Sequence, residues 1–340
     1  MHQFVVHVPK GLSLHGAIEF ASQLRSLPQA DEYLFDFERV GWVPPFSLLY
    51  VSSEIQRCVD RLSSVKFSVC NHRHMSYAAH MGFFKAFRVD FGNSPGEAQG
   101  SVTHVPITLF ECDELRQEAA KSHVQVAETI EAKSQEISAI LCQCDSGALF
   151  DTLVYALREV MRNVVEHSQS SQFGLCAQYW PKAGNVEVGL IDRGIGIRAA
   201  LSENPKLQTE SDRDALRLAL MPGISGKAHK QRRGVRYNVW AHSGFGLYMT
   251  SRLCRNGGNF FIASGNCGLS LKGGEKFDVQ IPFSGTAIRL NLRVDAIQDL
   301  TSKLDQFRKE GYEFAAGFGK SAVLSASTAS QMLSKDFPKR

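Results

Sequence analysis

In the first third of the chain, the hydrophobic and polar positions show strand-like segments that alternate with helix-like segments. From Gln3 to about Pro106, short apolar runs such as FVVHV (4–8) and EYLFDF (32–37) alternate with helix-like runs at 14–27 and 47–64. Strands that alternate with helices in this way are typical of a small α/β layer domain. The pattern therefore predicts a first α/β unit over residues 1–110.

A helical connector and a second unit are predicted to follow. Residues 111–143 contain no Gly or Pro and are rich in Ala, Glu, Gln and Lys, so 111–146 should form one long helix or two shorter ones. Residues 147–295 begin with a helix at 148–167 and have a second helix at 246–258. Strands are expected at 173–180, 186–192, 259–265, 275–281 and 286–292. This order predicts an α/β (α+β) fold with a mixed sheet covered by helices on one face, followed over 296–340 by one helix and a polar tail.

Composition narrows the class of protein. The chain has 340 residues, of which 44% are hydrophobic, and this is long enough for two compact domains. The net charge of +4 is small, so attraction to nucleic acid would have to come from local basic clusters. The cysteines have no CxxC spacing, which favours reduced thiols over a zinc site or a disulfide framework.

Targeting signals are not evident. The N-terminus lacks the basic start and apolar core of a signal peptide, and no apolar run reaches the roughly 18 residues that a membrane span needs. We therefore expect a cytoplasmic protein without a membrane partner.

Polar residues recur along one side of the helix expected at 148–167. Glu159, Asn163 and His167 are four residues apart, beside an apolar stripe. That stripe consists of Leu153, Leu157, Val160 and Val164. Taken alone, the polar row fits a solvated helix face as well as a binding site.

Two glycine clusters lie further along the same unit. The strand at 186–192 leads into Asp192-Arg-Gly194-Ile-Gly196, where glycines allow a sharp turn and close approach to a ligand. Gly244-Phe245-Gly246 comes directly before a helix, whose free N–H groups and dipole suit phosphate. Each cluster alone is a weak signal.

Together these motifs resemble the GHKL ATP-binding fold, which is shared by histidine kinases, DNA gyrase, a heat-shock chaperone family and mismatch-repair ATPases. The set comprises ExxxN at 159–163, DxGxG at 192–196, GxG at 244–246 and Gly285-Thr286 at the start of a strand. The resemblance covers residues 147–295 and implies ATP and Mg²⁺ as cofactors.

The resemblance also implies roles for individual residues. Asn163 would hold Mg²⁺ through its side-chain oxygen, and Glu159 would be the catalytic residue that orients or deprotonates the attacking water. Asp192 would accept a hydrogen bond from the adenine amino group, supported by Thr286. The other implied nucleotide-binding positions are Gly194, Gly196 and Ile197 around the base, and Gly244, Phe245, Gly246 and Leu247 beside the triphosphate.

A basic stretch lies between the second and third motifs, where the resemblance implies a mobile lid over the phosphates. It contains Lys227, Lys230, Arg232, Arg233 and Arg236. Lys227 is the first candidate for the γ-phosphate. A solvated basic loop is the alternative, and nucleic-acid contact together with Tyr237 and Trp240 is a lesser one.

The first unit resembles the STAS fold of anti-sigma-factor antagonists, in which a strand ending in Asp leads through a short loop to a helix. The loop that carries a phosphorylated serine in that family is Pro44-Pro45-Phe46 here, and the nearest hydroxyl is Ser47. His123 lacks the sequence surroundings of a phospho-acceptor histidine. His72, His74 and His80 are interpreted as a polar surface segment.

The expected function is that of a Mg·ATP-binding GHKL-type ATPase, a hydrolase used in signalling as a nucleotide-dependent regulatory or assembly switch. A protein partner would bind through the N-terminal unit, and nucleotide would favour a homodimer through the connector. The alternatives are an anti-sigma-type serine/threonine protein kinase and a non-hydrolysing nucleotide sensor or scaffold.

Overall fold

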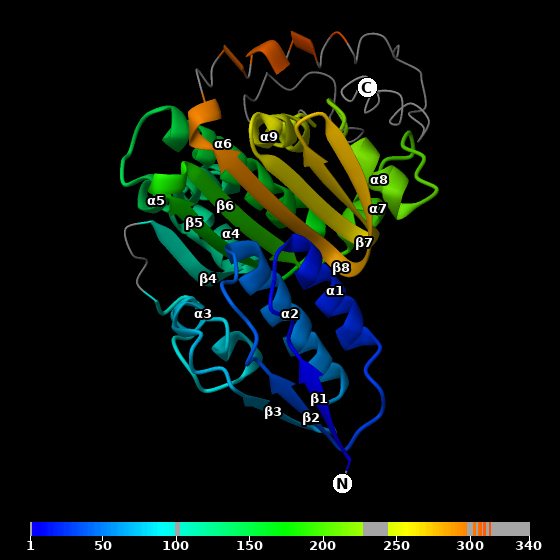
Figure 1. Cartoon of the computed structure of the whole chain (residues 1–340). Helices are drawn as coiled ribbons and strands as arrows, with labels where there is room; N and C mark the ends of the chain where they lie inside the picture. Colours follow the sequence, from blue (N-terminus) through cyan, green and yellow to red (C-terminus); the bar gives the residue numbers. More distant parts are fainter. Residues whose placement is uncertain are drawn as a thin grey trace.

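The structure is a computed structural model that describes residues 2–98, 103–226 and 244–297. Between 302 and 313 it also describes residues 302, 303, 305–307, 309, 310 and 313, all of which are helical. Two sheets and their helices form α/β architecture, as expected (Figure 1).

The N-terminal elements form a parallel sheet of three strands in the order β1-β2-β3. The elements are β1 (Gln3–His7), α1 (Leu14–Arg25), β2 (Glu32–Asp36), α2 (Pro45–Arg61), β3 (Lys66–Cys70) and α3 (Ser76–His80). Aromatic and branched residues of these strands share one hydrophobic core with residues of α1 and α2. The predicted alternation of strands and helices is confirmed for these residues.

The second sheet has five strands in the order β4-β5-β6-β8-β7. Its strands are β4 (His104–Glu111), β5 (Gln172–Trp180), β6 (Asn185–Asp192), β7 (Asn259–Lys272) and β8 (Glu275–Arg293). The helices of this part are α4 (Cys112–Lys121), α5 (Val126–Cys142), α6 (Ala148–Asn163), α7 (Gly196–Ser202), α8 (Asp212–Ala219) and α9 (Gly246–Arg255). The connector is thus two helices.

The expectation of a mixed sheet is wrong, because every neighbouring strand pair in this sheet is antiparallel. Short turns join β5 to β6 and β7 to β8, and such hairpins reverse the chain direction. The two strands expected at 275–281 and 286–292 are one strand, β8. Strand β4, within the range expected for the first unit, is the edge strand of this second sheet.

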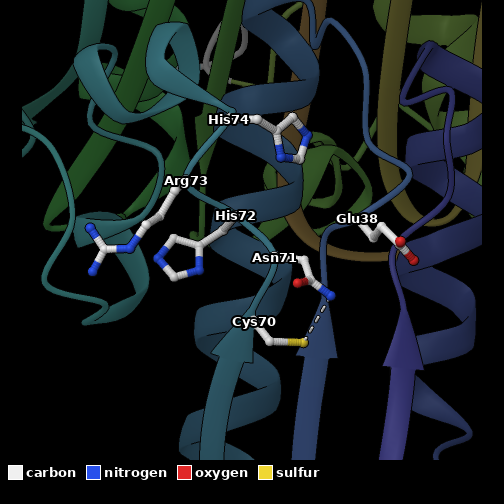
Figure 2. Close-up of a pocket in the computed structure, with 6 residues that line it drawn as sticks. All are labelled: Glu38, Cys70, Asn71, His72, Arg73 and His74. Atoms are coloured by element: carbon white, nitrogen blue, oxygen red, sulfur yellow. Dashed lines mark hydrogen bonds between the residues drawn. The ribbon is translucent and has the colours of Figure 1, made fainter.

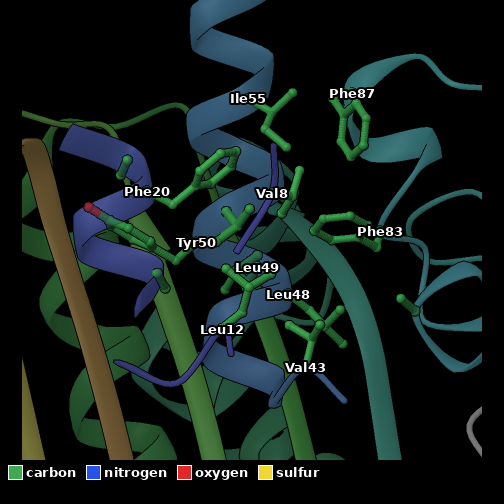
Figure 3. Close-up of a cluster of buried hydrophobic side chains, with 14 of the residues drawn as sticks. Val8, Leu12, Phe20, Val43, Leu48, Leu49, Tyr50, Ile55, Phe83 and Phe87 are labelled. Atoms are coloured by element: carbon green, nitrogen blue, oxygen red, sulfur yellow. The ribbon is translucent and has the colours of Figure 1, made fainter. Parts of the chain in front are cut away.

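Both faces of the antiparallel sheet are covered, whereas helices on one face were expected. One face packs against α5, α6 and their neighbours in a core that includes Ile130, Leu157 and Leu190. On the other face, residues of β6 and β8 join the core of the N-terminal unit. Figure 3 shows α2 carrying Leu48, Leu49, Tyr50 and Ile55 into that core. The N-terminal unit therefore completes the core of the second sheet.

Helix α2 approaches β5 and β6 closely because two glycines lie beneath it. A Cβ atom at Gly189 would lie 2.7 Å from the Phe46 Cα, and one at Gly174 would lie 2.8 Å from a Leu49 methyl. The Phe46 N–H donates to the Glu187 carboxylate over 3.1 Å. A carboxylate at a helix N-terminus is stabilising because it faces free N–H groups and the positive end of the dipole.

Glu187 has a second partner. Its other oxygen accepts from the Arg289 guanidinium over 2.6 Å, and the residue is 2% exposed. Burial of one charge is tolerated when it is paired and hydrogen-bonded. The charge of Glu187 is therefore compensated by two partners on the face of the sheet that α2 covers.

Among the described helices, none has the length and apolar character needed to cross a membrane.

We predict that Gly189→Ala lowers the free energy of unfolding by about 1–3 kcal/mol, because the new methyl group forces α2 away from β6. Urea denaturation checks this. Gly274→Ala is the control, since a Cβ there meets nothing within 4 Å. Equal stability of the two variants would contradict the close approach of α2.

Candidate nucleotide site

Helix α6 presents the first group of candidate residues. The apolar stripe is confirmed, because Leu153, Leu157, Val160 and Val164 are all buried. Glu159 and Asn163 lie on α6, but the chain then changes to a π-helical turn at Val164–Ser168. The regular α-helix, which was expected to continue to His167, therefore ends at Asn163. His167 lies in the π turn and is no longer aligned with Glu159 and Asn163. Such π turns occur often at functional sites.

Asn163 carries a buried polar atom that has no hydrogen-bond partner in the described part of the chain. Its Nδ2 atom forms no hydrogen bond to any described residue. Buried side-chain amides are ordinarily hydrogen-bonded, so an orphan atom calls for an explanation such as a ligand or solvent. Because the two ends of an amide are assigned from their surroundings, the atom at this unpartnered position is either the nitrogen or the oxygen of the Asn163 amide.

The end of β6 carries the second group. Asp192 is 2% exposed and lies opposite Thr286 in the register of β6 and β8. The Gly194 N–H donates to Asp192 Oδ1 over 2.8 Å. Burial raises the pKa of Asp192 from 3.8 to about 6, while hydrogen bonds from Gly194 and Thr286 oppose the shift. The structure thus buries a carboxylate among neutral donors.

Two glycines bring this turn against its neighbours. A Cβ at Gly194 would lie 1.9 Å from the Ser168 carbonyl oxygen, which accepts from the Ile195 N–H over 2.8 Å. Gly285 has a φ of +99°, and a Cβ there would lie 2.1 Å from the Asp192 carbonyl oxygen. Close contact at both positions requires glycine. The end of the π turn and the turn after Asp192 are therefore in contact.

Ser264 on β7 connects the turn after Asp192 to the turn at Gly285 through hydrogen bonds. This residue was not identified from the sequence. Its buried hydroxyl donates to the Gly285 carbonyl oxygen over 2.7 Å and accepts from the Ile197 N–H over 2.9 Å. A Cβ on Gly196, with its φ of +77°, would lie 2.7 Å from this hydroxyl. No motif marks Ser264, because its position depends on a register shift between β7 and β8.

The third group lies at the start of α9. Gly244 has a φ of +69° and its carbonyl oxygen accepts from the Gly223 N–H over 3.1 Å. Helix α9 begins at Gly246 after the buried Phe245, whose side chain does not cap it. Leu247 and Ile197 are half-buried against the same two cores. The helix start expected after Gly244 is confirmed.

Glu159 faces the first turn of α9. A Cβ at Gly246 would lie 2.1 Å from Glu159 Oε2, so this carboxylate is next to the helix start. The other oxygen accepts from Arg158 over 3.0 Å, and Arg158 is within 3.6 Å of Glu131. The geometry suits a carboxylate at a helix N-terminus and also places a proton acceptor beside the GxG motif.

The basic residues of the predicted lid lie outside the described residues. They are Lys227, Lys230, Arg232, Arg233 and Arg236. The i,i+4 pair of Arg162 and Glu166 is present at 2.9 Å.

Other candidate groups are separate from this site. The loop expected at Pro44-Pro45-Phe46 is wrong, because α2 already begins at Pro45. Ser47, the nearest hydroxyl, is fully buried in α2, where a protein kinase has no access to it. Figure 2 shows a polar hollow at the carboxyl ends of β2 and β3. It is lined by Glu38, Cys70, Asn71, His72, Arg73 and His74. Within residues 2–98, 103–226 and 244–297, no three His, Cys, Asp or Glu side chains form a group that could hold a metal ion.

Comparisons with known proteins give no relative for this chain: no protein-family model, no curated protein and no solved structure matches it.

We predict that Asp192→Asn stabilises the ligand-free protein at pH 7 by up to about 3 kcal/mol. With a pKa of about 6 when folded, Asp192 binds its proton more tightly in the folded protein than in the unfolded chain. Stability of the wild type therefore falls as the pH rises from roughly 4 to 6, and the neutral amide avoids this loss.

Urea denaturation of both proteins between pH 4 and 8 measures the difference, which should vanish near pH 4. Glu187→Gln is the control. The Glu187 carboxylate is paired with Arg289, so its removal should lower the free energy of unfolding. Lower stability of Asp192→Asn at pH 7 would contradict the burial of an uncompensated charge.

Proposed function

We propose that this chain is a Mg²⁺-dependent ATP-binding protein of the GHKL type, which uses nucleotide to switch its contact with a protein partner. The observation that supports this most directly is Asp192, an almost fully buried carboxylate whose pKa burial raises despite hydrogen bonds from Gly194 and Thr286 and the nearby charge of Arg193. Such a group is costly unless a ligand completes its hydrogen bonds. The adenine amino group is a donor of the right kind.

The neighbouring residues fit the same ligand. Asn163 would hold Mg²⁺ through its side-chain oxygen, and one end of its amide, assigned as Nδ2, has no hydrogen-bond partner among the described residues. The ion supplies positive charge that offsets the phosphates, and it favours few protein ligands. The first turn of α9, which the Phe245 side chain does not cap, offers N–H groups for phosphate.

Glu159 supports hydrolysis as the accompanying activity. It lies beside the start of α9 and would accept a proton from an attacking water. Its ion pair with Arg158 holds the carboxylate in one orientation. The N-terminal unit is the candidate partner surface, since it packs on the opposite face of the same sheet.

Calorimetric titration tests ATP binding. We expect the wild type to bind Mg·ATP, and Asp192→Asn to bind it roughly 10- to 100-fold more weakly, because a hydrogen bond to a charged group is lost. Asn163→Ala should abolish the difference between titrations with Mg²⁺ and with a chelator. Asp295→Asn, the same change at an exposed position, should bind as the wild type does. Absence of heat from the wild type would refute the proposal.

Turnover with labelled ATP tests the role of Glu159. We predict that Glu159→Gln binds ATP normally but releases phosphate on the order of 10²–10⁴-fold more slowly, because the proton acceptor is gone. Label transferred to a protein would instead support the kinase alternative. Binding without turnover in the wild type would support a nucleotide sensor.

A further inference from the structure

Arg193, within the DxGxG motif, faces the opposite side of the sheet from Asp192. Successive residues of a strand point to opposite faces. Leu190 belongs to the core under α6, while Ile191 belongs to the core that contains α2. Asp192 therefore faces the α6 side, and Arg193 reaches α2, where its guanidinium donates to Ser53 over 2.6 Å and to Glu54 over 2.7 Å.

Glu54 is a buried carboxylate that pairs with Arg193. It is 4% exposed and is shared by Arg193 and by Arg25 of α1, the latter at 2.9 Å. The Arg193 guanidinium also lies over the Phe283 ring, 4.1 Å from its centre. A buried carboxylate between two guanidinium groups fixes both, because removing any member leaves a desolvated charge. Helices α1 and α2 thus hold Arg193 in place.

The backbone of Arg193 is held equally tightly. A Cβ at Gly285 would lie 2.7 Å from the Arg193 Cα. The next residue, Gly194, donates its N–H to Asp192 and touches Ser168. A change in the Arg193 side chain is therefore passed within one residue to the hydrogen bond that orients the Asp192 carboxylate.

We infer that Glu54 and Arg193 are positioning residues for adenine recognition, through which the N-terminal unit sets the affinity and base preference of the nucleotide site. This inference rests on the proposed ATP binding. The Glu54–Arg193 pair lies on the α2 face of the sheet and would not contact the nucleotide. It acts by holding the Asp192–Gly194 turn in the shape that accepts the adenine amino group.

The test measures the affinities of the full chain for Mg·ATP and Mg·GTP. Glu54→Gln keeps the shape of the side chain but removes its charge, and we expect roughly 3- to 30-fold weaker ATP binding, the range for residues that act at a distance. The ratio of ATP to GTP affinity should fall by the same factor, because only the base contact is disturbed. A purely structural role would leave this ratio unchanged.

Two further variants complete the design. Glu136→Gln is the matched control, because it makes the same change at an exposed residue of α5, and it should keep the wild-type ratio. Ser53→Ala removes only a neutral hydrogen bond to Arg193 and gives a smaller fall in the ratio if Glu54→Gln does not fold. A wild-type ratio in both Glu54→Gln and Ser53→Ala, with wild-type ATP binding intact, would overturn this inference alone. Failure of the wild type to bind ATP would overturn the proposed function as well.

Discussion

The close packing of α2 on β5 and β6 is the constraint from which the rest of the architecture follows. Gly174 and Gly189 have no side chains, so the helix can approach the strands closely. The Glu187 carboxylate accepts a hydrogen bond from the first turn of the helix. This contact gives the antiparallel sheet its second covered face and merges the N-terminal core with it. The two units are consequently joined by a shared core, rather than only by a connector.

Strand β6 contains two buried carboxylates with opposite energetic roles. Glu187 is paired with Arg289 and faces a helix start, so its charge is compensated. Asp192 accepts hydrogen bonds from neutral groups, and burial raises its pKa to about 6 although the charge of Arg193 opposes the shift. Proteins retain costly groups of this kind mainly where function requires them. That contrast within one strand is the strongest physical argument that the Asp192 turn is a site.

Much of the fold follows from local sequence patterns. The strand and helix positions in the N-terminal unit, the stripe on α6 and the glycine turns at 194–196 and 244–246 are visible because they depend on nearby residues. Strand pairing was predicted poorly, since the antiparallel order of β4 to β8 depends on partners far apart in the chain. The π turn after Asn163 and the role of Ser264 are set by tertiary contacts that no short motif contains.

The pKa of the Asp192 carboxyl, followed by carbon-13 NMR with and without saturating Mg·ATP, tests the central claim most directly. Donors to the charged form lower a carboxyl pKa. If adenine completes the hydrogen bonds of Asp192, its pKa should fall from about 6 toward or below its ordinary value when nucleotide is bound. An unchanged pKa at saturation would contradict the assignment of Asp192 as the residue that recognises the base.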